Sequence, residues 1–184
     1  MRALADAARI GRLMEALGEE ADADARIYFT GGATAVLFGW RRSTIDVDVK
    51  IVPDRDRLFR ALPALKERLQ LNLELASPDD FIPVRAGWED RSPFIRRTGR
   101  VSFHHFDLYA QALAKVERGH RQDLADVQEM LSRGLIERDQ ALAYFQAIEP
   151  LLYRYPAIDG PTFRGAVQEV FGSLNTPGSS PSNS

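Results

Sequence analysis

Apolar and polar residues alternate strictly from 45 to 51, and this short segment constrains the fold more than any other part of the chain. A period of two predicts a β-strand with one apolar face and one polar face. Asp46 and Asp48 lie two residues apart, so they share the polar face. Their oxygens can jointly bind a hard divalent ion such as Mg²⁺. An ordinary strand with a solvated acidic face would give the same pattern.

A glycine pair precedes this strand. The β-rich run 27–29 ends at Gly31 and Gly32, and residues 33–38 then continue as a helix-compatible apolar segment. A glycine adopts positive φ easily, so it lets backbone N–H groups approach a phosphate, and the start of the following helix favours the same negative charge. By itself such a pair often makes only a turn. The order of strand, glycine turn, helix and acidic strand favours a nucleotide site.

Hydrophobic spacing along the rest of the chain predicts an α/β (α+β) fold, a small mixed, twisted sheet flanked by helices. Further strands are expected over 71–75 and 101–106, and irregular structure ordered by packing over 77–99. Helices are expected over 4–17, from 54 to 69, in two pieces between 108 and 131, over 138–153 and over 165–171. We expect one domain over 1–172, with a core at 26–107, a helical part at 108–172 and a disordered tail at 173–184.

Composition excludes several kinds of site. The chain has 184 residues, no cysteine and three histidines, so disulfides and thiolate metal sites are excluded and a structural zinc site is not expected. The formal net charge of -2 provides no global attraction for nucleic acid. No apolar run approaches the length of a membrane span, so no membrane association and a cytoplasmic location are expected.

Arg42 and Thr44 stand between the glycine pair and the aspartates, in the run Arg42-Ser43-Thr44-Ile45-Asp46-Val47-Asp48. With this run, residues 26–135 resemble the nucleotidyltransferase superfamily with the DNA polymerase β fold. The Arg-x-Thr-x-Asp-x-Asp form is similar to the AbiEii-type and related minimal bacterial nucleotidyltransferases of toxin–antitoxin systems.

The resemblance implies a role for each of these residues. Gly31 and Gly32 would hold the β- and γ-phosphates of an NTP, Asp46 and Asp48 would bind Mg²⁺, and Arg42 and Thr44 would contact the nucleotide.

The resemblance extends to the second half of the chain. In the resembled family a lysine on the helix after the sheet faces phosphate, and an arginine and an Asp-x-x-Asp follow it. These roles fall on Lys115 and Asp123, and less directly on Arg121 and Asp126. A pair of exposed, charged helices would show the same residues.

A third carboxylate usually completes the superfamily site. Glu74, which faces away from its apolar neighbours, is the first candidate for this catalytic group, and Asp107 is the second. His104 and His105 are adjacent on a strand and point to opposite faces, so they cannot form a simple metal pair, and hydrogen-bonded, partly buried histidines are expected.

These features favour a magnesium-dependent nucleotidyltransferase that moves NMP from NTP to an RNA such as tRNA, a protein or a small molecule, with an antitoxin or toxin as a further partner. One alternative is a nucleotide-binding or partner-binding module of the same fold without activity. Another is an RNA-binding protein that uses the arginines at 91, 96, 97 and 100.

Overall fold

The computed structural model describes residues 3–173. The strands of its main sheet are β2 (Ala25–Thr30), β4 (Asp46–Val52), β5 (Asn72–Leu75), β6 (Phe94–Thr98) and β7 (Val101–His105). They lie in the order β5–β4–β2–β7–β6. β2 is antiparallel to β4 and parallel to β7, while β5 is parallel to β4 and β6 is antiparallel to β7. This mixed sheet, with helices beside it, confirms the predicted fold class.

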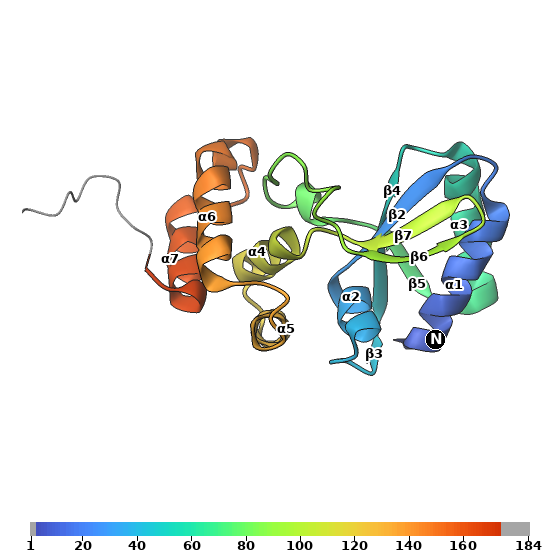
Figure 1. Cartoon of the computed structure of the whole chain (residues 1–184), viewed down its shortest axis with the longest axis horizontal. Coiled ribbons are helices and arrows are strands. Elements are labelled where there is room, and N and C mark those ends of the chain that lie inside the picture. Colours follow the sequence, from blue (N-terminus) through green and yellow to red (C-terminus); the bar gives the residue numbers. More distant parts are fainter. Residues whose placement is uncertain (1–2, 174–184) are drawn as a thin grey trace, which may run out of the picture.

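The helices form two groups, one beside the sheet and one in the C-terminal half of the chain (Figure 1). The first group consists of α1 (Ala7–Glu20), α2 (Gly31–Phe38) and α3 (Asp56–Leu69). The second consists of α4 (Leu108–Arg118), α5 (Arg121–Ser132), α6 (Arg138–Ile148) and α7 (Gly160–Phe171). Short 3-10 turns are η1 (Pro78–Asp80) and η2 (Glu149–Arg154), and a small ladder pairs β1 (Ala5–Asp6) with β3 (Ser43–Thr44). No helix within residues 3–173 is both long and apolar enough to cross a bilayer.

One hydrophobic cluster joins the sheet to the first group of helices, and we call this part the sheet lobe. Val47, Val49 and Ile51, the apolar face of β4, are buried in it together with residues of α1 and α3. The alternation of β4 therefore directs Asp46 and Asp48 to the other face. That face is turned toward the helical part of the chain.

A second hydrophobic cluster lies among α4, α5, α6 and α7, which form the helical lobe together with η2. Tyr28 of β2 belongs to this cluster, so the sheet contributes to both. The irregular segment before β6 is held by aromatic packing: Trp88 stacks on Phe106 at 4.3 Å between ring centroids and meets Tyr28 edge-on at 4.8 Å. The part of the predicted irregular segment that precedes β6 is thus ordered by packing, as expected.

Some boundaries differ from the prediction. β6 lies in the segment expected to be irregular, because Arg96 and Arg97 interrupt its apolar pattern and only pairing with β7 reveals the strand. α1 begins at residue 7, where Asp6 caps it by accepting a hydrogen bond from the Arg9 N–H at 2.8 Å. α6 ends at residue 148, followed by η2, and α7 begins at 160. Except for Ser173, the predicted tail lies outside the described residues.

Helix α2 lies so close to β3 that Gly32 has no room for a side chain. A Cβ there would lie 2.0 Å from Thr44 Oγ1 and 2.7 Å from Thr44 Cβ. We expect Gly32→Ala to destabilise the protein by roughly 1–3 kcal/mol through overpacking. Thr44→Ala in the same chain removes the nearest atom and should recover part of that loss. Thermal unfolding followed by circular dichroism measures both changes.

Gly165→Ala is the matched control, because a Cβ at this position in α7 meets nothing within 4 Å. It should raise the melting temperature slightly, since alanine favours a helix over glycine. A Gly32→Ala protein as stable as the wild type would contradict the packing described for α2.

Candidate active site

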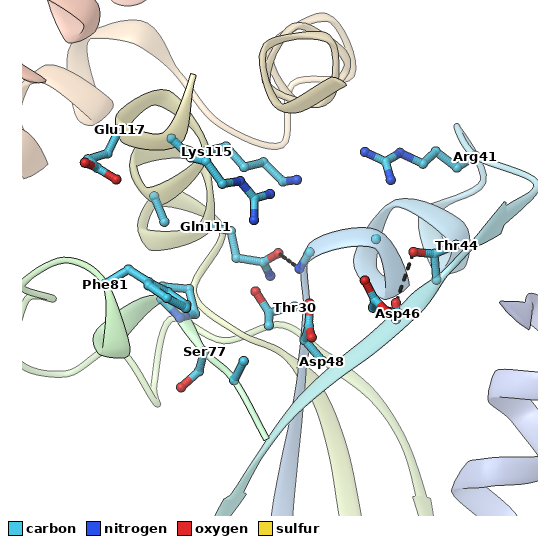
Figure 2. A pocket seen from close by; sticks show the side chains of 16 residues that line it. Thr30, Arg41, Thr44, Asp46, Asp48, Ser77, Phe81, Gln111, Lys115 and Glu117 are labelled. Carbon is cyan, nitrogen blue, oxygen red and sulfur yellow. Dashed lines mark hydrogen bonds between the residues drawn. The ribbon is translucent and has the colours of Figure 1, made fainter. Parts of the chain in front are cut away.

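A pocket of about 410 Å³ lies where the polar face of β4 meets the helical lobe (Figure 2). Its wall combines the β2–α2 turn, the start of β4, the η1 segment and one side of α4. It brings together six of the predicted site residues: Gly31, Gly32, Thr44, Asp46, Asp48 and Lys115. Residues separated by some 85 positions in the chain thus share one cavity.

The glycine turn reaches the aspartates directly. Gly31 has φ +60°, and a Cβ on it would lie 3.1 Å from Asp48 Oδ2. The Gly31–Gly32 start of α2 thus forms part of the pocket wall, and the first N–H groups of a helix have no partner within the helix. One of these is occupied: the Gly31 N–H donates a 3.0 Å hydrogen bond to Gln111 Oε1.

A buried network fixes Gln111, a residue that sequence reasoning did not identify. Its Nε2 donates to Thr34 Oγ1 at 3.1 Å and to the Phe106 carbonyl at 2.8 Å. Thr34 Oγ1 in turn lies 3.0 Å from His105 Nδ1. Burial lowers the pKa of His105 to about 4, so the ring is neutral near pH 7. His105 thus stabilises the glycine turn indirectly, through Thr34 and Gln111.

Asp46 and Asp48 share a face of β4, and the adjacent strand adds a third acid to that face. Glu74 stands opposite Asp48 in the parallel β4–β5 register, and Asn72 stands opposite Asp46 and donates a hydrogen bond to it. Glu74 is exposed and lies outside the pocket wall. Among residues 3–173, no three acidic or histidine side chains are grouped so as to hold a metal ion.

Asp48 is the electrostatically unusual carboxylate of the site. Burial and the nearby charges of Asp46 and Glu74 raise its pKa from 3.8 to about 6, although Arg118 and Lys115 oppose the shift. No residue in the described part of the chain donates a hydrogen bond to it. The ionised form is therefore poorly compensated until a cation arrives.

Lys115 lines the pocket from α4, and its ammonium group pairs with two acids of α5 that lie outside the pocket wall. Its Nζ lies 2.7 Å from Asp126 Oδ2 and 3.5 Å from Asp123 Oδ1. Asp123 is buried and receives two further bonds from Arg118, which also lines the pocket. Burial raises the pKa of Asp123, but the bonds and charges of Arg118 and Lys115 outweigh that effect and lower it. Asp123 thus positions cations and does not line the pocket.

Asp126 is fully buried and connects the two lobes. It accepts hydrogen bonds from Trp40 Nε1 at 3.0 Å and Arg41 Nε at 2.9 Å, in addition to that from Lys115. Arg41 lines the pocket, whereas Arg42, the predicted nucleotide contact, is exposed and outside its wall. Arg118 likewise reaches the pocket while Arg121 is exposed.

Asp107, the second candidate for the third acid, has a structural role. It caps α4 by accepting a bond from the Tyr109 N–H at 3.1 Å, and it forms a 2.8 Å ion pair with Arg91. It is fully buried and absent from the pocket wall. His104 is half-buried and within hydrogen-bond reach of Ser102 Oγ at 3.2 Å, so both histidines have structural positions.

Each of the four arginines considered as an RNA contact has a partner within residues 3–173. Arg91 pairs with Asp107, Arg96 bonds the Gly11 carbonyl, and Arg97 and Arg100 pair with Asp24. None of the four lines the pocket.

The raised pKa of Asp48 predicts a pH-dependent gain in stability for Asp48→Asn. A carboxyl with pKa about 6 in the fold and 3.8 as the ordinary value destabilises the fold increasingly from about pH 4 to pH 6. The variant, measured by thermal unfolding with EDTA, should therefore melt about 2–6 °C above the wild type at pH 7.5, and the gap should close near pH 4.

Asp56→Asn is the control for this series, because its side chain on α3 is 89% exposed. It should show no comparable gain. An Asp48→Asn protein that is less stable than the wild type at pH 7.5 would show that the Asp48 charge is compensated in the fold.

The chain matches a known protein family over most of its length. Residues 7–149 match the family described as "Nucleotidyltransferase of unknown function (DUF6036)". The matched residues include the glycine turn, the β4 aspartates, α4 and α5. No curated protein and no solved structure gives a significant match. The match confirms a nucleotidyltransferase-like family, while the DNA polymerase β fold superfamily and the AbiEii-type branch stay predictions. The chain belongs to the DUF6036 family of nucleotidyltransferases of unknown function.

Proposed function

We propose that this protein is a magnesium-dependent nucleotidyltransferase that transfers NMP from an NTP to an acceptor hydroxyl. The observation that carries the proposal is the pocket itself, in which the Gly31–Gly32 turn, Asp46 and Asp48 face cationic side chains of α4. Family membership supports nucleotidyl transfer in general and an NTP as substrate.

The triphosphate would bind between the glycine turn and three cations. Arg41, Lys115 and Arg118 all line the pocket, and two buried acids behind them hold them in place. Because these cations are positioned before the ligand arrives, binding loses little side-chain entropy. The start of α2 adds the positive end of a helix to the same wall.

Asp46 and Asp48 fit a magnesium ion by their chemistry. Both offer hard oxygen donors on one face of β4, and a bound cation would relieve the unfavourable charge that raises the pKa of Asp48. Two protein carboxylates suffice, since Mg²⁺ usually takes its other ligands from substrate phosphates and water. When bound, the ion would activate the acceptor oxygen and neutralise charge on the leaving pyrophosphate.

Glu74 is the proposed proton acceptor. It shares the sheet face with Asp48, one strand away, and its exposure leaves it open to an incoming hydroxyl. The acceptor oxygen would form a bond to the α-phosphorus as the bond from that phosphorus to the β-phosphate bridge breaks. Pyrophosphate leaves, and the hydroxyl proton passes to the Glu74 carboxylate.

The pocket does not by itself identify the acceptor of the NMP group or the biological role of the protein. RNA, protein and small molecules all carry suitable hydroxyls, and the role in a toxin–antitoxin pair stays a prediction from the sequence resemblance. The local partners of the four arginines give no support to an RNA grip outside the pocket.

Transfer is tested by incubating the protein with each α-³²P-labelled NTP, Mg²⁺ and separate RNA, protein and metabolite fractions. The wild type should label one fraction and release pyrophosphate. Asp46→Asn with Asp48→Asn should lower transfer at least about 100-fold, because both metal ligands lose their charge. Circular dichroism should show an unchanged fold, and Asp56→Asn, which replaces an exposed side chain of α3, should keep full activity.

Transfer retained by the double aspartate variant would refute the mechanism. NTP binding without pyrophosphate release in any fraction would instead identify the inactive nucleotide-binding module of the same fold.

A further inference from the structure

The pocket has a second end that the proposed phosphate and metal contacts do not use. Figure 2 shows Phe81, Ser77 and Glu117 on the side opposite Arg41 and Thr44, with Asp48 and Thr30 between the two groups. Pro78 and Ala114 add apolar surface to that side. We call these five residues, Ser77, Pro78, Phe81, Ala114 and Glu117, the η1 end of the pocket.

Phe81 is a large aromatic side chain held in an exposed position. It remains 57% exposed, although it follows η1 directly and its neighbour Ile82 is fully buried. Both residues donate backbone hydrogen bonds of 3.0 Å to the Pro78 carbonyl. A lone exposed phenylalanine is ordinary on a surface. This one lines a pocket whose other end is polar and charged.

The turn that carries Phe81 is anchored from both lobes. Asp80 accepts a 2.8 Å bond from the Ser77 N–H, which caps η1. Asp79 pairs with Lys50 of β4 at 2.5 Å, and its carbonyl accepts a 2.7 Å bond from the Tyr155 hydroxyl. The aromatic ring is therefore presented on a fixed support, which suits stacking of a flat ligand.

Glu117 is a carboxylate without a partner. It is half-buried at the pocket wall, yet it makes no hydrogen bond or ion pair with any residue in the described range 3–173. The acids Asp123 and Asp126 on the next helix, in contrast, are fully engaged by cations. Glu117 thus offers two free acceptor oxygens at the same end of the pocket as Phe81.

We propose that the η1 end binds the nucleobase of the NTP, with Phe81 stacking on the base, and that Glu117 makes the site prefer guanine. This inference rests on the proposed function, because it takes the other end of the pocket as the triphosphate site. A volume of about 410 Å³ lies within the range of small-molecule sites.

The preference for guanine follows from the donor pattern of the bases. Guanine presents two adjacent donors, N1–H and the N2 amino group, which match the two oxygens of a carboxylate. Adenine and cytosine present one amino donor next to a ring acceptor, which the carboxylate repels. Uracil places its single N–H between two carbonyl oxygens. Because a carboxylate only accepts hydrogen bonds, Glu117 ranks GTP first.

Binding is measured by calorimetry with GTP, ATP, CTP, UTP and inorganic tripolyphosphate, each with Mg²⁺. The wild type should bind GTP about 10- to 100-fold more tightly than UTP. Phe81→Ala should weaken GTP and ATP roughly tenfold or more and leave tripolyphosphate unchanged, since it removes only stacking. Phe81→Tyr should retain near wild-type affinity.

Glu117→Gln should bring GTP to within about threefold of ATP, because an amide no longer offers two acceptors. The controls lie outside the pocket: Phe94→Ala replaces another exposed phenylalanine, and Glu19→Gln replaces an exposed glutamate of α1. Both should bind all five ligands like the wild type.

Two results would overturn the inference and keep the proposed function: equal affinity for all four NTPs, or GTP binding that is insensitive to Phe81→Ala but lost in Asp46→Asn with Asp48→Asn. If neither NTPs nor tripolyphosphate bind, the proposed function fails as well. Failure of the nucleobase inference alone is therefore distinguishable from failure of the proposed function.

Discussion

The pocket depends on the hydrogen bonds and ion pairs that the buried carboxylate of Asp126 accepts. It receives Trp40 and Arg41 from the segment after α2 and Lys115 from α4, so it binds groups of both lobes at once. A fully buried carboxylate is tolerated only when donors satisfy it. Here the donors are also the cations of the pocket wall. Asp126 thus both joins the two lobes and positions the cations of the pocket wall.

The charges of the pocket are separated in the absence of a ligand. Arg41 and Lys115 have their counter-charges behind them, away from the cavity, while Asp48 on the opposite wall lacks any hydrogen-bond donor among residues 3–173 and its pKa is raised to about 6. The proposed ligand, an anionic chain with a divalent cation, would satisfy the two walls together. The fold holds an energetically unfavourable carboxylate at the place where such a ligand would use it.

Periodic features were the predictable ones. Strict alternation placed Asp46 and Asp48 on one face of β4, and the glycine pair marked the start of α2, because both depend only on local backbone geometry. Non-periodic positions were not predictable: the loop after α2 directs Arg41, and not Arg42, to Asp126, a residue some 85 positions away. Phe81 belongs to an irregular segment whose path is set by long-range packing, and β6 is defined by its pairing with β7.

The bond between Gln111 and the Gly31 N–H has a consequence for which anions can occupy the turn. The amide oxygen already stands 3.0 Å from the backbone nitrogen that an incoming anion would use, and two further bonds keep it there. An anion that bonds to the Gly31 N–H would therefore replace the Gln111 oxygen as acceptor, and the net gain in binding free energy would be small. A single inorganic phosphate gains little from that exchange alone. A longer polyanion would also reach Lys115 and Arg41, so the proposed site would favour long polyanions over the small anions of the surrounding solution.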